Sequence, residues 1–345
     1  MRTPGDSRLS KLWFRYRLRW KRRRLLFRIW RKRRQIVPVN IRTDDISADA
    51  ILCFVVVRNE MLRLPYFLDH YRKLGITHFL IVDNASDDGS ADFLTSQPDV
   101  SLWTTSHSYK LARFGMDWLG WLQWRFAHGH WCLTVDSDEL LIYPGSDTKG
   151  LADLTAWLDA SGTHSFGALM LDMYPKGPVS DTVYAPGQDP VDALSWFDAG
   201  NYRYRTHPVF DNLWIQGGVR ERMFFAGTPD KSPTLSKTPL VRWHWRHVYV
   251  SSTHQMLPRK LNHVFDIDAH SKVTGVLLHT KFLPDIAAKS AEEITRAQHF
   301  ENSAAYVAYH QALTENPVLW SAESYLYKDA QQLVDLGLMS KGHWV

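Results

Sequence analysis

The segment WCLTVDSDELLIY, residues 131–143, decides the fold that we predict for this chain. Its apolar run ends abruptly in three carboxylates, Asp136, Asp138 and Glu139, and then resumes. This pattern predicts a buried strand that places acidic groups at its carboxyl end, where open α/β sheets bind their ligands. Asp136 and Asp138 are two residues apart, so both can reach one hard cation from a turn. A strand followed by a solvated acidic turn is the alternative interpretation.

Two earlier segments also end in polar groups. The run ILCFVVV stands directly before Arg58, Asn59 and Glu60, and the run THFLIVD ends in Asp83. A helical recurrence of apolar residues separates the two runs, and this strand–helix–strand order predicts a parallel sheet with right-handed crossovers. Because the carboxyl ends of parallel strands share one edge of a sheet, we expect the three segments to meet at one crevice.

The composition permits a sizeable core. The chain has 345 residues, of which 45% are hydrophobic, so it can form one large domain or two ordinary ones. Its two cysteines, Cys53 and Cys132, lie inside apolar runs, which favours buried thiols over a disulfide or a metal site. Neither a Walker lysine loop nor a G-x-G-x-x-G segment opens a helix, which argues against a kinase or a dehydrogenase.

The charge is concentrated at the beginning of the chain. Residues 1–34 contain fifteen Lys or Arg and one Asp, whereas residues 35–345 contain 26 basic and 35 acidic side chains. The tail has no apolar run long enough to span a bilayer and no signal-peptide core. We therefore expect a cytoplasmic protein with a basic tail and a mildly acidic body.

If this tail is helical, five aromatic side chains fall on one side of it: Trp13, Tyr16, Trp20, Phe27 and Trp30. A basic amphipathic helix of this kind binds an anionic membrane surface. We therefore expect residues 11–34 to hold the protein at the inner face of the membrane. Nucleic-acid binding and a solvated, disordered tail are the alternatives.

The segments FVVVRNE, FLIVDNASDDGS and WCLTVDSDELL, in this order, resemble the nucleotide-sugar half of a family 2 type glycosyltransferase with the GT-A fold. The similarity is to a bacterial subgroup that pairs an RNE strand end with a D-x-D-E-L/F motif. It covers about residues 50–145 and extends less sharply to about residue 285. It implies an α/β, Rossmann-like GT-A fold, with a mainly parallel sheet flanked by helices, a loop-rich acceptor region and C-terminal helices.

The resemblance also implies roles for individual residues. The side chains that would bind the nucleotide sugar are Arg58, Asn59, Glu60, Asp83 and Asp136. The D-x-D segment would hold Mn²⁺ or Mg²⁺ through Asp136 and Asp138, with His279 as a further metal ligand. Lys281 stands two residues after His279 on a predicted strand and can meet a diphosphate as a point charge. A buried strand histidine without a metal is the alternative for His279.

The acceptor side is predicted from the second half of the chain. Residues 176–240 form a long stretch rich in Pro, Gly and aromatic residues, which is typical of a binding surface. Within it, IQGGVRERMFF resembles a segment that lies at the acceptor side of the subgroup, which implies acceptor contacts for Arg220 and Arg222. Glu221 is our candidate base for an inverting transfer. A surface Arg–Glu–Arg cluster is the alternative, and Asp172 and Asp198 are rival bases.

Three histidines follow in residues 236–258. His244, His247 and His254 suggest zinc, but no cysteine and no H-E-x-x-H motif accompanies them. We favour an aromatic and polar wall on which His244 and His247 contact sugar hydroxyls and phosphates, and keep structural zinc as the alternative.

The sequence thus predicts a metal-dependent glycosyltransferase, inverting, that uses a nucleotide-diphosphate sugar and a glycan or lipid-linked acceptor in cell-envelope or exopolysaccharide synthesis. The rival functions are a sugar-phosphate nucleotidyltransferase and a non-catalytic protein that binds sugar or nucleic acid. The predicted organisation is a basic tail (1–34), a linker (35–50), a nucleotide-sugar half (51–145), an acceptor half (146–285) and a C-terminal helical region (286–345).

Overall fold

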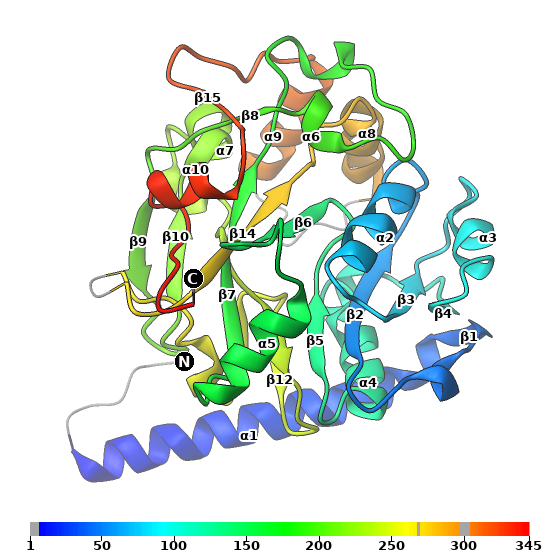
Figure 1. The fold of residues 1–345 in the computed structure, drawn as a ribbon, viewed down its shortest axis with the longest axis vertical. Helices are drawn as coiled ribbons and strands as arrows, with labels where there is room; N and C mark the ends of the chain where they lie inside the picture. Colours follow the sequence, from blue (N-terminus) through cyan, green and yellow to red (C-terminus); the bar gives the residue numbers. More distant parts are fainter. Residues whose placement is uncertain (1–6, 268–269, 297–303, 345) are drawn as a thin grey trace.

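The computed structural model describes residues 7–267, 270–296 and 304–344, which fold around one large sheet (Figure 1). In spatial order its nine strands are β1 (Val37–Asn40), β4 (Val100–Thr104), β3 (His78–Asp83), β2 (Ile51–Val57), β5 (Trp131–Thr134), β11 (Ser236–Arg242), β7 (Ser165–Asp172), β14 (Thr274–His279) and β6 (Glu139–Ile142).

Most of these strands point the same way. Strands β4, β3, β2 and β5 are parallel neighbours, and β7 is parallel to β14. Strands β1, β11 and β6 are antiparallel to the strands beside them. The predicted fold class is therefore confirmed as α/β, with a mainly parallel sheet flanked by helices. Because β11 and β6 run against their neighbours, their first residues lie at the edge where the parallel strands end.

Helices cover both faces of the sheet. On one face lie α2 (Leu64–Lys73), α3 (Ser90–Thr95) and α5 (Leu151–Ala160), and on the other α4 (Met116–Phe126) packs beside the hairpin of β12 (Val248–Ser251) and β13 (Gln255–Leu257). Helix α2 forms because Leu64, Phe67, Leu68 and Tyr71 recur at helical spacing and are all buried against the sheet.

The second half of the chain is more regular than the sequence predicted. The stretch 176–240, which we expected to be mostly loop, contains α6 (Pro190–Ala193), β8 (Trp196–Phe197), β9 (Arg203–Thr206), β10 (Leu213–Gln216), α7 (Gly218–Phe224) and the first part of β11. These elements are short, and β9 is mostly exposed, so they lack the long apolar periodicity that identifies a strand or helix.

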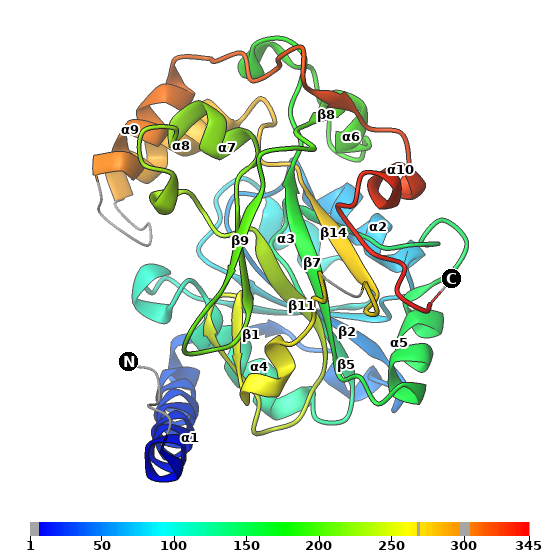
Figure 2. The same ribbon diagram turned by 90° about the vertical axis from the view of Figure 1, so that its left-hand side faces the viewer.

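The predicted C-terminal helices are present as α8 (Ile286–Arg296), α9 (Ala304–Thr314) and α10 (Ala330–Asp335). Residues 297–300, which we predicted to continue α8, lie outside the described residues. Strand β15 (Tyr325–Leu326) pairs with β8. In Figure 2, α7, α8 and α9 lie together at one end of the sheet.

The N-terminal region joins the body at two places. Strand β1 lies within residues 35–50, which we expected to be a linker, and it adds an edge strand to the sheet. Helix α1 (Arg8–Lys32) runs along the base of the molecule and packs on it through Phe14, Leu18 and Ile29 (Figure 1). Among the described residues, no helix is both long enough and apolar enough to cross a bilayer.

Candidate active site

A cavity of about 760 Å³ opens at the edge of the sheet where the parallel strands end. It is lined by the segments after β2 and β5, by the start of β11 and by the end of β14. The structure thus brings together most of the predicted site residues. Those that line the cavity are Arg58, Asn59, Glu60, Asp136, Asp138, Arg220, His279 and Lys281.

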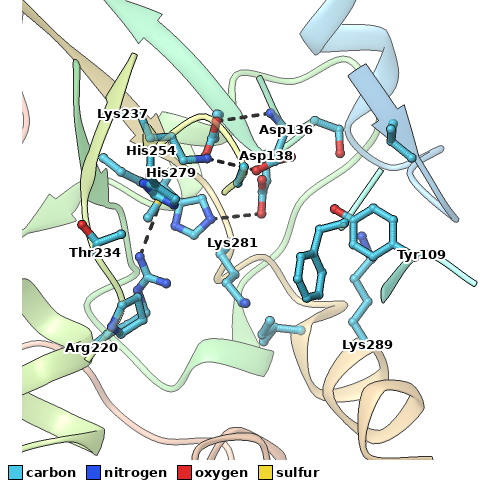
Figure 3. Close-up of a pocket in the computed structure, with 18 of the residues that line it drawn as sticks. Tyr109, Asp136, Asp138, Arg220, Thr234, Lys237, His254, His279, Lys281 and Lys289 are labelled. Carbon is cyan, nitrogen blue, oxygen red and sulfur yellow. Dashed lines mark hydrogen bonds and ion pairs between the residues drawn. The ribbon is translucent and has the colours of Figure 1, made fainter. Parts of the chain in front are cut away.

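Strand register brings His279 between two carboxylates. His279 pairs with Asp172 across the parallel strands β14 and β7, and its Nδ1 lies 2.6 Å from Oδ1 of Asp172. Its Nε2 lies 3.2 Å from Oδ2 of Asp138 (Figure 3). The Asp138 turn is anchored to the same strand end, because the backbone nitrogen of Thr280 donates to the Asp138 carbonyl oxygen at 2.7 Å.

The electrostatics of this group follow from burial and close charges. Burial works against ionisation of Asp138, but His279 and the more distant Arg63 outweigh it and hold the pKa of Asp138 well below its usual range. Burial also lowers the pKa of His279, and Asp138 and Asp172 reverse this effect and raise it. Asp172 stays ionised because Arg220 and His279 lower its pKa against the effect of burial.

The first acid of the motif faces a lysine. Nζ of Lys237 lies 3.1 Å from Oδ2 of Asp136 and bonds Oε1 of Glu139. Burial lowers the pKa of Lys237, but these two carboxylates outweigh it and raise the pKa above its ordinary value. Lys237 is therefore a fixed positive charge beside the acidic segment.

The carboxylates and the histidine at this edge of the sheet differ in how well they fit a divalent cation. No group of three His, Cys, Asp or Glu side chains among the described residues is arranged to hold a metal ion. Oδ2 of Asp138 and Nε2 of His279, however, lie 3.2 Å apart, and Asp172 orients the ring from behind, as the partners of metal-bound histidines do. Mg²⁺ and Mn²⁺ are commonly held by one or two side chains together with phosphate oxygens and water. Asp138 and His279 fit that role, whereas the Asp136 carboxylate is bonded to Lys237.

At the predicted nucleotide side, hydrogen bonds and an ion pair hold the turn after β2 in place. The guanidinium of Arg58 donates to the carbonyl oxygens of Asn84 at 2.7 Å and Ala85 at 3.0 Å. Asn59 has a positive φ of 52° and accepts a hydrogen bond from the backbone nitrogen of Asp87 through Oδ1. Glu60 bonds Lys289 of α8 at 2.6 Å.

Asp83 has a different position from its predicted neighbours. It is buried at the end of β3 and is not among the residues that line the cavity. Its carboxylate accepts hydrogen bonds from the backbone nitrogen and the hydroxyl of Ser86. Asp83 therefore shapes the turn that supports Asn59 from behind.

The residues of α7 that we predicted for the acceptor side point in different directions. Arg220 is buried, lines the cavity and bonds Asp172 at 2.7 Å. Glu221 lies behind the cavity wall, where Arg203 and the hydroxyl of Ser232 bond its carboxylate. Adjacent residues of a helix are rotated by about 100° around its axis, so Arg220 and Glu221 point to different sides of α7.

Arg222 and the rival base Asp198 bond each other. Nε and Nη2 of Arg222 lie 2.9 Å and 3.0 Å from the Asp198 carboxylate, which also accepts from Tyr174. Neither residue lines the cavity. This pair holds α7 against the C-terminal region, since Arg222 also donates to the carbonyl oxygen of Leu319.

The structure places the histidines differently from the prediction. His244 and His247 lie in the turn after β11, beside Trp243 and His128, and are not among the residues that line the cavity. His254 lines it instead. Nδ1 of His254 lies 2.8 Å from the carbonyl oxygen of Ser236, so that nitrogen carries the proton and Nε2 keeps a lone pair. Burial, together with Lys237, lowers the pKa of His254 to about 4.

Sequence reasoning missed several cavity residues. Lys237, Asp230 and Trp214 all line the cavity but come from elements without a recognisable motif. Lys237 could have been noticed as a charged residue at the start of an apolar run, since a lysine there needs an acidic partner. Figure 3 shows Lys237 and His254 on one side of Asp138 and Lys289 on the other.

No protein-family model matches the chain, and no curated protein matches it. Several solved structures show weak similarity to it, and three of them serve as examples. A 4-diphosphocytidyl-2C-methyl-D-erythritol synthase is 14% identical, with a TM-score of 0.25, over 41% of this chain and 66% of that one. The mannosyltransferase PcManGT from Pyrobaculum calidifontis, in complex with GDP-Man and Mn²⁺, is 20% identical, with a TM-score of 0.28, over 46% of both chains.

The third structure is a protein from Bacillus anthracis, assigned as a glucose-1-phosphate thymidylyltransferase and bound to sucrose. It is 10% identical, with a TM-score of 0.28, over 78% of this chain and 85% of that one. The chain thus spans less than two thirds of the synthase and of the mannosyltransferase. Similarities this low carry no functional conclusion, which has to come from the site.

Proposed function

We propose that the chain is a glycosyltransferase that moves a sugar from a nucleotide-diphosphate sugar to an acceptor hydroxyl, with a divalent cation and with inversion at the anomeric carbon. The observation that carries the proposal is the Asp138–His279–Asp172 group at the edge of the sheet. Its members Asp138 and His279 line the same cavity as Arg58 and Glu60. This arrangement supports a site for a diphosphate between a metal position and a nucleotide position.

Each residue would have a physical task. Asp138 and His279 would hold Mn²⁺ or Mg²⁺, and the bound cation would offset the negative charge that develops on the leaving diphosphate. Asp172 keeps the proton on Nδ1 of His279, so that Nε2 faces Asp138. Lys281 lines the same cavity and can add a point charge beside the phosphates.

The acceptor hydroxyl needs a proton acceptor at the cavity. Glu221, which the sequence predicted, is enclosed by Arg203 and Ser232, and its side chain is only 12% exposed. Asp230 bonds the same Arg203, lines the cavity and is 81% exposed. We therefore propose Asp230 as the base and keep Glu221 as the alternative.

The first experiment is calorimetric binding of UDP, GDP, ADP and CMP to the full chain, with and without Mn²⁺. We expect one nucleoside diphosphate to bind in a metal-dependent way, and Asp138→Ala to abolish this binding. Asp147→Ala is the matched control, because Asp147 is exposed and lies outside the cavity. If no nucleotide binds under any condition, the proposal fails.

Product analysis separates this proposal from the sugar-phosphate nucleotidyltransferase alternative. A glycosyltransferase releases a nucleoside diphosphate from a nucleotide sugar, whereas a nucleotidyltransferase releases pyrophosphate from a nucleoside triphosphate and a sugar phosphate. Release of pyrophosphate alone would replace our proposal. Metal-dependent nucleotide binding without turnover, over a panel of nucleotide sugars and acceptors, would favour a binding protein.

A further inference from the structure

Helix α1 has two faces with different environments. Phe14, Leu18 and Ile29 are buried against the body, where they meet Val209 and Phe210 of the β9–β10 turn and the β12–β13 hairpin. At about 100° per residue, these three side chains project in one direction. One face of the helix is therefore used for packing within the chain.

The opposite face is aromatic and exposed. Trp13, Trp20 and Trp30 are 60%, 54% and 46% exposed. Two aromatic pairs add area, because Trp13 stacks on Tyr16 at 5.4 Å between ring centroids and Phe27 stacks on Trp30 at 5.8 Å. Figure 2 shows α1 end on, at the margin of the molecule. The exposed fractions show that the rest of the described chain leaves much of this row uncovered.

Positive charge borders the aromatic row. Helix α1 contains twelve Lys or Arg and no Asp or Glu. Arg17, Arg24 and Arg31 are exposed along one side of the row, and Arg19 along the other. Arg28, by contrast, bonds the buried Asp117 of α4 at 2.6 Å.

We propose that this exposed face of α1, defined by Trp13, Tyr16, Trp20, Phe27 and Trp30 with the bordering arginines, lies in the headgroup region of an anionic lipid bilayer. Aromatic rings favour that region because they have both apolar and polar edges, and arginines attract anionic lipids. The packing of the opposite face on the body places the helix axis parallel to the membrane surface.

The shape of the surface favours a bilayer over a nucleic acid. Proteins that stack bases present aromatic rings along a groove that also holds the phosphate backbone. Here the rings stack on each other along the outward face of a helix whose opposite face packs on the body. A flat lipid surface can contact the whole row at once.

The experiment is co-flotation of the full chain with vesicles of phosphatidylcholine alone and of phosphatidylcholine mixed with phosphatidylglycerol. We expect binding only to the anionic vesicles. Trp13→Ala, Trp20→Ala and Trp30→Ala together should weaken it at least about tenfold, because aromatic area inserted at the interface is lost. Arg17→Gln, Arg24→Gln and Arg31→Gln together should weaken it on the order of 100-fold at low salt.

Matched controls remove exposed apolar groups from the far end of the molecule. Tyr325→Ala and Leu326→Ser together should leave vesicle binding unchanged, because these two exposed residues form β15, at the opposite end from α1 in Figure 1. Unchanged thermal unfolding and unchanged nucleotide binding in every variant would show that the fold and the cavity are intact.

Two results would overturn the proposal. The first is anionic-vesicle binding that the tryptophan variant retains in full. The second is binding of a single-stranded oligonucleotide that both α1 variants abolish, without any binding to vesicles. Both measurements are independent of turnover, so a failure here would leave the proposed activity untouched.

Discussion

Nζ of Lys237 lies 3.1 Å from Oδ2 of Asp136, a residue 101 positions earlier in the chain. The same ammonium also bonds Glu139, whose side chain has no exposed surface. Burial raises the pKa of Glu139 to about 7, and Lys237 opposes that shift. The lysine at the start of β11 therefore neutralises the acidic segment that follows β5, and it joins the two strands at the site.

This relationship predicts the effect of removing the lysine. Lys237→Met leaves Glu139 buried without its cation and should destabilise the fold by about 3–5 kcal/mol. Lys237→Met combined with Glu139→Leu should recover most of this loss. Lys289→Met is the control, because Lys289 pairs with Glu60 and Asp285 at a partly exposed position and should cost about 1 kcal/mol or less. Urea unfolding measures all three, and equal losses for the two single variants would contradict the interpretation.

Asp172 should act on the metal through His279. Asp172→Asn removes the carboxylate that orients Nδ1, so the affinity for Mn²⁺ in the presence of nucleotide should fall about 10–100-fold. Asp198→Asn also breaks an Asp–Arg pair, with Arg222, but Asp198 is not a partner of His279, so the metal affinity of this variant should be unchanged. Calorimetric titration of both folded variants decides the point. Equal losses of affinity would mean that Asp172 has only a structural role.

The identity of the base can be tested by a pair of amide substitutions. Asp230→Asn should lower kcat by about 10²–10⁴-fold if Asp230 takes the acceptor proton, whereas Glu221→Gln should lower it by less than about tenfold. Both residues bond Arg203, so the loss of an ion pair affects both variants. The opposite order of effects would return the role to Glu221.

A partly buried histidine, His70, predicts how stability depends on pH. Burial lowers the pKa of His70 to about 4, and its Nε2 donates to the carbonyl oxygen of Leu141 at 3.2 Å. Between this value and the ordinary pKa near 6.5, the unfolded chain binds a proton that the folded chain does not, so stability falls as the pH falls through this window.

The measurement compares urea unfolding at about pH 7.5 and about pH 5.5, where His70 alone should account for a loss of about 1 kcal/mol. His70→Gln keeps a donor for Leu141 and should reduce the pH dependence by that amount. His343→Gln changes an exposed histidine and should leave the dependence as it was. If His70→Gln keeps the pH dependence of the unmodified protein, the pKa of His70 does not differ between the folded and the unfolded chain.

The local patterns that the sequence contains were enough to predict the strands around the proposed nucleotide position. Strands β2, β3 and β5 are apolar runs that end in polar groups, and Arg58, Asn59 and Asp138 do line one cavity. The placement of His279 also agrees with its predicted neighbourhood, because β14 ends at the same edge as β5.

What could not be predicted depends on contacts between distant segments. Lys237 reaches Asp136 only because β11 inserts antiparallel between β5 and β7, and no local pattern in the sequence specifies that insertion. Similarly, Arg220 and Glu221 are adjacent in the sequence, but the helical rotation turns one into the cavity and the other behind its wall. The five exposed aromatic residues of α1 did fall on one side of a helix, but its buried face needs a partner that the sequence does not identify.

The buried face of α1 lies very close to α4. Gly120 lies in the middle of α4, where glycine costs about 1 kcal/mol relative to alanine. A Cβ at this position would lie 2.7 Å from Cδ1 of Ile29, so the close approach of α1 explains the glycine. Gly120→Ala should therefore lower stability by about 1–2 kcal/mol despite its better helix propensity. Ile29→Val removes the clashing methyl group and should cost about 1 kcal/mol alone.

The double variant tests the contact itself. If α1 packs on α4 in solution, Gly120→Ala with Ile29→Val should cost less than the sum of the two single changes, with a coupling energy of at least about 0.5 kcal/mol. A urea-unfolding cycle over the four proteins measures this coupling. Strict additivity would mean that the two side chains do not meet, and α1 would then be free of the body, with its aromatic row no longer held in a fixed direction.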